Sequence, residues 1–159
     1  MIGGFIAAAV ICFGILAAIG TAENARLADA LLAVAKQVVR DDPIFNDTIK
    51  HYAIDYSLLP ENARAGFKKK FESWLSEFND GEVETDYNIL DKRGVLQEDE
   101  NGDGVPDVFF LTLDLVTMSG NEFRTHFSRF GPFCATFGTY TAQFIDGEWQ
   151  TAVEISLIS

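Results

Sequence analysis

The sequence predicts an α+β fold: a long N-terminal hydrophobic helix, two further helices and a C-terminal antiparallel sheet of about four strands. Three observations support this. The first 22 residues carry no charged side chain, a helical pattern continues from there to Arg40, and the apolar period changes from 3.6 to 2 at about Val105. We therefore expect a hydrophobic segment, 1–22, forming a transmembrane or filament-core helix, and an acidic head domain, 23–159, into which the helix continues to about residue 40.

The N-terminal segment has the length and composition of a membrane-spanning helix. From Met1 to Ile19 the only polar side chain is that of Cys12. About 20 helical residues span the ~30 Å hydrocarbon core of a bilayer. A cleaved secretory signal is the alternative, since Gly20-Thr21-Ala22 could be a cleavage site, but such signals begin with basic residues and none precedes Arg26. We expect a retained helix from about Gly3 to Arg40, roughly 55 Å long.

The second half of this helix carries one apolar stripe, which predicts packing onto the head. The stripe has helical spacing and consists of Leu27, Leu31, Val34, Ala35 and Val38. The helix should end at Asp41-Asp42-Pro43, because the residue before a proline is disfavoured in the α region.

Two shorter helices are expected next. Asn46–Ser57 has an apolar face formed by Ile49, Tyr52, Ala53 and Tyr56. Residues 61–78 follow Pro60 and have a longer apolar face, formed by Ala63, Phe67, Phe71, Trp74, Leu75 and Phe78. The run Lys68-Lys69-Lys70 is interpreted as a solvated face of this helix.

Alternation of apolar and polar residues predicts the sheet. It is clearest from Phe109 to Leu115 and from Trp149 to Leu157, and weaker over Phe123–Phe130 and Phe133–Ile145. Asp146-Gly147 is a typical two-residue hairpin turn.

Composition excludes several functions. The chain has 159 residues, 48% of them hydrophobic, which suits one folded domain. Its net charge of −12 argues against binding nucleic acid.

His51 and His126 lack metal-ligand spacing, and Cys12 and Cys134 belong to different elements and are not expected to pair. No catalytic motif is present, so we expect no enzyme; a pocket containing His126 or Asp114 would be the alternative.

One segment has the pattern of a calcium-binding loop, D-x-N-x-D-G-x-x-D. Calcium binds six to eight oxygen atoms. The side chains of Asp99, Asn101, Asp103 and Asp107 and the carbonyl of Val105 could supply them, and Gly104 permits a sharp turn. The segment resembles calcium loops of the EF-hand, dockerin and thrombospondin-repeat types.

The loop departs from an EF-hand at its twelfth position. Phe110 stands where the EF-hand has a bidentate glutamate. A further ligand would have to come from Glu98, Asp91 or Asp114. The alternative interpretation is a solvated acidic turn before a strand, since Asn, Asp and Gly are common turn residues.

The order of the elements resembles that of a mature type IV pilin or pseudopilin. Residues 1–22 and 23–40, followed by strands from Val105 onward, carry this resemblance. It implies a filament whose N-terminal helices pack together, with Gly3, Gly4 and Gly14 allowing close approach of backbones. The family usually has a glutamate near the start of this helix, and Phe5 occupies that place here.

The resemblance implies a structural subunit of an extracellular pilus-like filament with a calcium-stabilised head. Its partners would be identical or other pilin-like subunits, and the membrane before assembly. The chain would be membrane-anchored first and then extracellular or on the cell surface. The alternative is a single-pass membrane-anchored accessory module of nuclear-transport-factor-like fold in a membrane or secretion complex.

Overall fold

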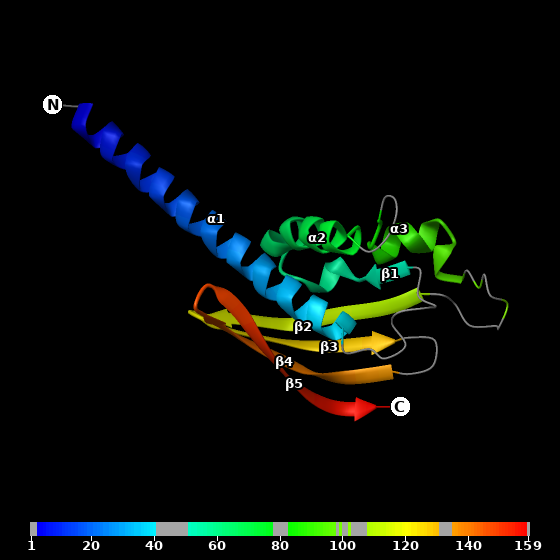
Figure 1. The fold of residues 1–159 in the computed structure, drawn as a ribbon. Helices are drawn as coiled ribbons and strands as arrows, with labels where there is room; N and C mark the ends of the chain where they lie inside the picture. Colours follow the sequence, from blue (N-terminus) through cyan, green and yellow to red (C-terminus); the bar gives the residue numbers. More distant parts are fainter. Residues whose placement is uncertain are drawn as a thin grey trace.

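A long helix packs across one face of a five-stranded sheet, and a second helix packs on the first (Figure 1). The computed structural model describes residues 3–40, 51–77, 83–97, 99, 102, 108–130 and 135–158, with the side chains of these residues other than 3–21 and 155–158. The long helix is α1 (Gly3–Arg40) and the second is α2 (Glu61–Leu75).

The sheet has its strands in chain order, β1 to β5. They are β1 (His51–Ile54), β2 (Val108–Ser119), β3 (Glu122–Phe130), β4 (Ala135–Ile145) and β5 (Glu148–Ile158). β1 pairs in parallel with β2, and the other neighbours are antiparallel. The Asp146-Gly147 hairpin turn is confirmed: both residues have positive φ, 52° and 91°, as a type I′ turn requires.

The core lies between α1, α2 and the inner face of the sheet. All five residues of the predicted α1 stripe are buried. They belong to one cluster with the α2 residues Phe67 and Phe71 and with inward-facing strand residues, including Phe109, Leu111, Leu113, Phe123 and Tyr140. Burial of large apolar side chains stabilises a fold by about 1.5–3 kcal/mol each, so this cluster attaches the second half of α1 firmly to the head.

The predicted helix Asn46–Ser57 is wrong. His51–Ile54 is strand β1, and Tyr56–Leu58 forms a short 3₁₀ helix, η1; residues 46–50 lie outside the described part of the chain. Of the apolar positions that suggested a helical face, Tyr52, Ala53 and Tyr56 are buried, the first two in the strand that pairs with β2. The periodicity of so short an apolar run does not distinguish a helix from a strand, so pairing with a neighbouring strand decides its conformation.

The segment between α2 and β2 contains two short elements that the sequence pattern did not indicate. They are α3 (Tyr87–Lys92) and the 3₁₀ helix η2 (Val95–Gln97). Asp86 begins α3 by accepting a hydrogen bond from the backbone N–H of Asn88, at 3.0 Å. Leu90, Val95 and Leu96 form a small second cluster with Ala53 and Val108.

The predicted fold class is corrected in two further respects. The sheet has five strands, and it is mixed rather than antiparallel throughout. The prediction of a transmembrane helix is also wrong: among the residues that the structure describes, no helix is long and apolar enough to cross a membrane. The part of α1 whose side chains are described is amphipathic and contains Glu23, Arg26 and Asp29.

Candidate functional site

The two halves of α1 have different surroundings. Among the α1 side chains that the structure describes, from Ala22 onward, core burial begins at Leu27. Residues 3–21, here called the stem, extend beyond the head as the blue end of the helix in Figure 1. The predicted assembly residues Gly3, Gly4, Phe5 and Gly14 all belong to the stem; their backbone is helical, and their side chains lie outside the described set.

Arg26 holds α1 where the stem leaves the head. Its guanidinium donates a hydrogen bond to Oδ1 of Asn121, in the turn between β2 and β3. The same guanidinium lies 4.8 Å from the ring centroid of Phe144 and 5.6 Å from that of Trp149. Cation–π contacts of this kind stabilise by about 0.5–2 kcal/mol each. The contacts of Arg26 therefore set the direction of the stem relative to the sheet.

Further contacts fix α1 along its length. Asp29 forms an ion pair with Lys70 of α2, and Lys36 lies 5.5 Å from the ring centroid of Trp74. Near the end of the helix, Nη1 of the buried Arg129 donates to the carbonyl oxygen of Val38, at 3.2 Å. A cation at this position complements the negative end of the helix dipole. These contacts join α1 to α2 and to the sheet.

A partly buried polar network connects α2 to the segment before α3. The hydroxyls of Tyr56 and Thr85 are 2.6 Å apart, and Thr85 Oγ1 donates to Glu72 at 3.0 Å. Lys68 Nζ lies 2.6 Å from Glu84, 3.6 Å from Glu72 and 3.9 Å from Asp86. Lys68 is therefore paired with three carboxylates of its own chain. The role of the network is to link α2 to the segment before α3.

The pKa values in this network are shifted in opposite directions. Burial raises the pKa of Glu72, against the opposing effects of Lys68 and Thr85. Burial also acts to raise the pKa of Glu84, but the hydrogen bonds from Lys68 and Asp86 outweigh it and the pKa is lowered. The pKa of Tyr56 is raised, chiefly by burial.

Little of the predicted calcium loop falls within the described residues. Asp99 Oδ1 accepts a hydrogen bond from the backbone N–H of Gly102, at 2.8 Å, and Gly102 has φ of 73°. Asn101, Asp103, Val105 and Asp107 lie outside the described part of the chain, as do Gly104 and Glu98. Within the described ranges of the chain, no group of three His, Cys, Asp or Glu side chains could hold a metal ion. The calcium site stays a prediction.

His126 and Asp114 lie side by side on the outer face of the sheet, the face away from α1. They are paired in the β2–β3 register and line a hollow of about 260 Å³ with Ser128 and Thr139. The Ser128 hydroxyl is hydrogen-bonded to Thr112 rather than to His126. Nucleophilic catalysis would need the serine bonded to a base, so this arrangement gives no support to the enzyme alternative. His51 lies apart from them, in β1.

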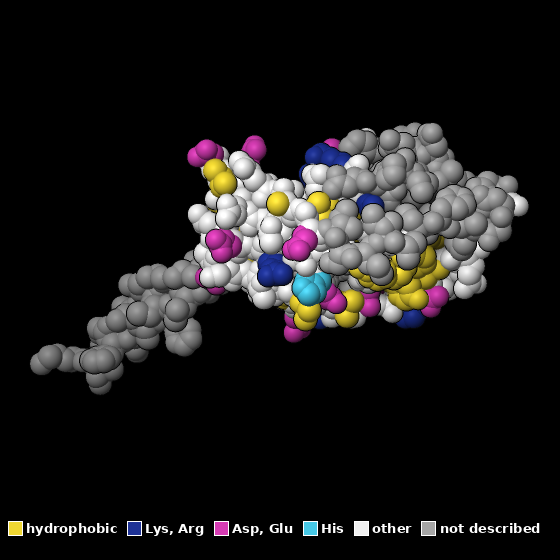
Figure 2. Space-filling model, turned by 90° about the horizontal axis from the view of Figure 1, so that it is seen from below, with side chains coloured by type: hydrophobic (Ala, Val, Ile, Leu, Met, Phe, Trp, Pro, Cys, Tyr) yellow, Lys and Arg dark blue, Asp and Glu magenta, His cyan; other side chains and the backbone are white. Residues whose placement is uncertain are grey.

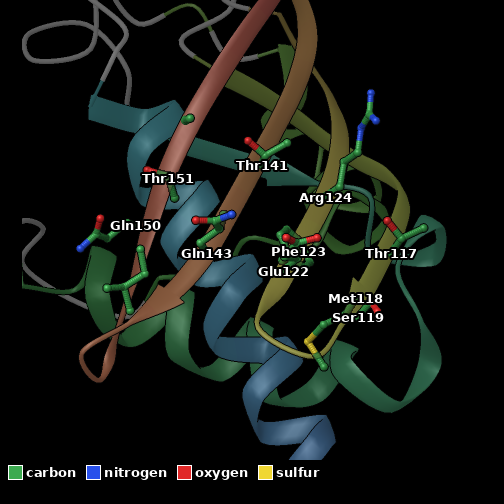
Figure 3. Close-up of a pocket in the computed structure, with 13 residues that line it drawn as sticks. Thr117, Met118, Ser119, Glu122, Phe123, Arg124, Thr141, Gln143, Gln150 and Thr151 are labelled. Carbon is green, nitrogen blue, oxygen red and sulfur yellow. The ribbon is translucent and has the colours of Figure 1, made fainter.

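A larger hollow lies beside it on the same face, near the β2–β3 turn and the β4–β5 hairpin. Its volume is about 730 Å³. We call it the outer hollow; the side chains that line it on the outer face are Thr117, Ser119, Glu122, Arg124, Thr141, Gln143, Ile145, Gln150 and Ala152 (Figure 3). The alternation of apolar and polar residues does not predict this hollow, because alternation shows which residues face outward but not which of them become neighbours.

Strand register arranges these side chains in two rows across the sheet. Ser119, Glu122, Gln143 and Gln150 are successive partners in one row, and Thr117, Arg124, Thr141 and Ala152 in the next. In Figure 2 charged side chains are scattered singly over the described surface, and hydrophobic ones gather toward the end far from the stem.

Comparison with protein-family models, curated proteins and solved structures gives no match to this chain.

Proposed function

We propose that the chain is a structural subunit of a pilus-like filament, in which the stem packs against the stems of neighbouring copies. The observation that carries the proposal is the division of α1: one uninterrupted 38-residue helix has its second half buried on the head, while its first half extends away from it. A stem anchored in this way gives every subunit the same geometry, which a repeating assembly requires.

The composition of the stem supports self-association. No charged residue occurs before Glu23, and the stem is rich in glycine and alanine. Small residues let helices approach closely, so that van der Waals contacts extend along both backbones. Burial of apolar side chains between stems would add about 25 cal/mol for each Å² removed from water.

The remainder of the chain suits the outside of such a filament. The head carries all the charged residues, and its net charge of −12 keeps heads from clumping non-specifically. We place the filament outside the cell or on its surface, where free calcium suits the weak affinity of extracellular loops of this kind.

The variant Gly14→Leu tests stem packing, with Gly14→Ala as its matched control. Leucine would hold neighbouring backbones apart, whereas alanine keeps the stem narrow and is the better helix former. Electron microscopy and sedimentation of the full chain should show filaments for the wild type and for Gly14→Ala, and none for Gly14→Leu. Far-UV circular dichroism should show the head folded in all three. Normal filaments from Gly14→Leu would overturn the proposal.

A further inference from the structure

We propose that the outer hollow binds a neutral, hydroxyl-rich ligand of the carbohydrate class. Its volume of about 730 Å³ falls within the ~300–1,000 Å³ typical of small-molecule sites. It lies on the sheet face opposite α1, so packing of the head onto its own helix does not cover it.

The lining is built to both donate and accept hydrogen bonds. Thr117, Ser119 and Thr141 present hydroxyls, and Gln143 and Gln150 present amides. Each of these groups carries donors and acceptors together, as sugar hydroxyls do. Neighbouring strands lie ~4.8 Å apart, so side chains in one row can reach successive groups of a single extended ligand.

These groups are not engaged elsewhere in the molecule. Within the described part of the chain, no hydrogen bond or ion pair joins the side chains of Glu122, Gln143 or Gln150 to another residue. The other end of the same face differs, because there Thr112 and Ser128 bond to each other. These side chains are exposed, so the hydrogen bonds of a ligand would replace hydrogen bonds to water, and each would add only a modest net gain in affinity.

Charge selects a neutral ligand. Glu122 and Arg124 are the two charged residues that line the outer hollow, and their charges cancel. Figure 3 shows Gln143 near the centre, while Arg124 extends away from it toward the rim. An anionic ligand would meet Glu122 and the net charge of −12, whereas a cation would meet Arg124 and a single carboxylate.

The outer hollow also contains small apolar surfaces that could contact the C–H groups of a sugar. Ile145 is 39% exposed, and Ala152 is exposed beside Thr141 in the register. Sugar rings present C–H groups between their hydroxyls, so they can use both kinds of contact. The proposal is independent of filament formation.

Saturation-transfer difference NMR on the full chain tests carbohydrate binding, because the method observes the ligand and tolerates large assemblies. The probes are maltotriose, cellotriose and triacetylchitotriose, with trigalacturonic acid as the charged comparison, each at millimolar concentration. We expect signal from at least one neutral trisaccharide and none from the charged one. No signal from any neutral probe, or equal signal from the charged probe, would overturn the proposal.

Variants locate the binding. Gln143→Leu and Thr141→Val remove hydrogen-bonding groups at nearly constant volume, and each should weaken binding at least fivefold. Thr139→Val is the matched control, since Thr139 lines the smaller hollow on the same strand; it should leave affinity unchanged. Thr141→Val also supplies the readout if Gln143→Leu fails to fold. Equal affinity in the lining variants and the wild type contradicts the proposal. If no trisaccharide binds the wild type and Gln143→Leu changes its sedimentation, the occupant of the outer hollow is a second copy of the chain, and the carbohydrate proposal is contradicted.

Discussion

Gly138 has no space for a side chain. A Cβ built there would lie 2.5 Å from the carbonyl oxygen of Glu154 and 2.7 Å from the ring of Phe127. The position also adjoins a register shift between β4 and β5. Backbone on one side and a buried ring on the other leave no easy relaxation, so only glycine fits.

We therefore expect Gly138→Ala to lower the free energy of unfolding by about 2–3 kcal/mol, the usual cost of overpacking. Urea denaturation followed by tryptophan fluorescence measures it. Gly66→Ala is the control, because the added methyl would meet only the Cβ of Ala28, at 3.4 Å, and a helix interior favours alanine. Its change should be below about 1 kcal/mol and stabilising. Similar losses in both variants would contradict the packing argument.

Glu84 gives the fold a stability component that depends on pH. Its pKa is lowered below 4.5, because hydrogen bonds from Lys68 and the backbone N–H of Asp86 outweigh the effect of burial. A carboxylate with a lower pKa in the folded state stabilises that state above its unfolded pKa, and the stabilisation is lost as the pH falls through the folded pKa.

Glu84→Gln should thus reduce the free energy of unfolding by about 1 kcal/mol at pH 7. The difference from wild type should shrink as the pH falls below 4.5. Glu72→Gln is the contrasting variant: burial raises the Glu72 pKa, so ionised Glu72 opposes folding at neutral pH, and its removal should cost less. Denaturation series at several pH values measure both. A constant Glu84→Gln difference across that range would be inconsistent with this assignment.

At the scale of the elements, the loop between η2 and β2 is where the sequence predicts a calcium ion. The hydrogen bond from Gly102 to Asp99 gives the start of the loop a turn, with Gly102 in the left-handed region. Calcium would join the remaining acidic positions and thereby stabilise the connection into β2.

We expect millimolar calcium to raise the Tm of the full chain by a few degrees, because an ion that binds only the folded state stabilises it by mass action. Asp103→Ala should abolish the shift. Magnesium is the control ion; it demands tighter octahedral geometry and should shift the Tm less. Differential scanning calorimetry measures these changes. An unchanged wild-type Tm in 5 mM calcium would remove the calcium site from the account.

At the scale of the whole molecule, α1 is both a core element and a projection from the core. Its second half is held by the apolar stripe, by Arg129 at its end and by Arg26 at its exit from the head. Rotating α1 about its axis would break several of these contacts at once. The stem consequently has one direction relative to the sheet, and the outer hollow faces away from it.

Much of the core could be predicted from the sequence. The stripe from Leu27 to Val38, the inward positions Phe67 and Phe71, and the Asp146-Gly147 turn all follow from local patterns that the structure confirms. Local patterns failed at His51–Ile54, where four residues are too few to reveal a period and pairing with β2 decides the conformation. The hydrophobic pattern also predicted a membrane-spanning helix, and the described residues contain no helix that could cross a membrane.

The local order of side chains thus determined which side of a helix or strand is buried, because that choice depends only on the period of the element itself. Tertiary structure alone decided which elements meet: the parallel placement of β1, the contacts of Arg26 with Asn121 and Phe144, and the rows that make the outer hollow. Such neighbours are set by the free energy of the whole packed sheet, to which residues far apart in the chain contribute together.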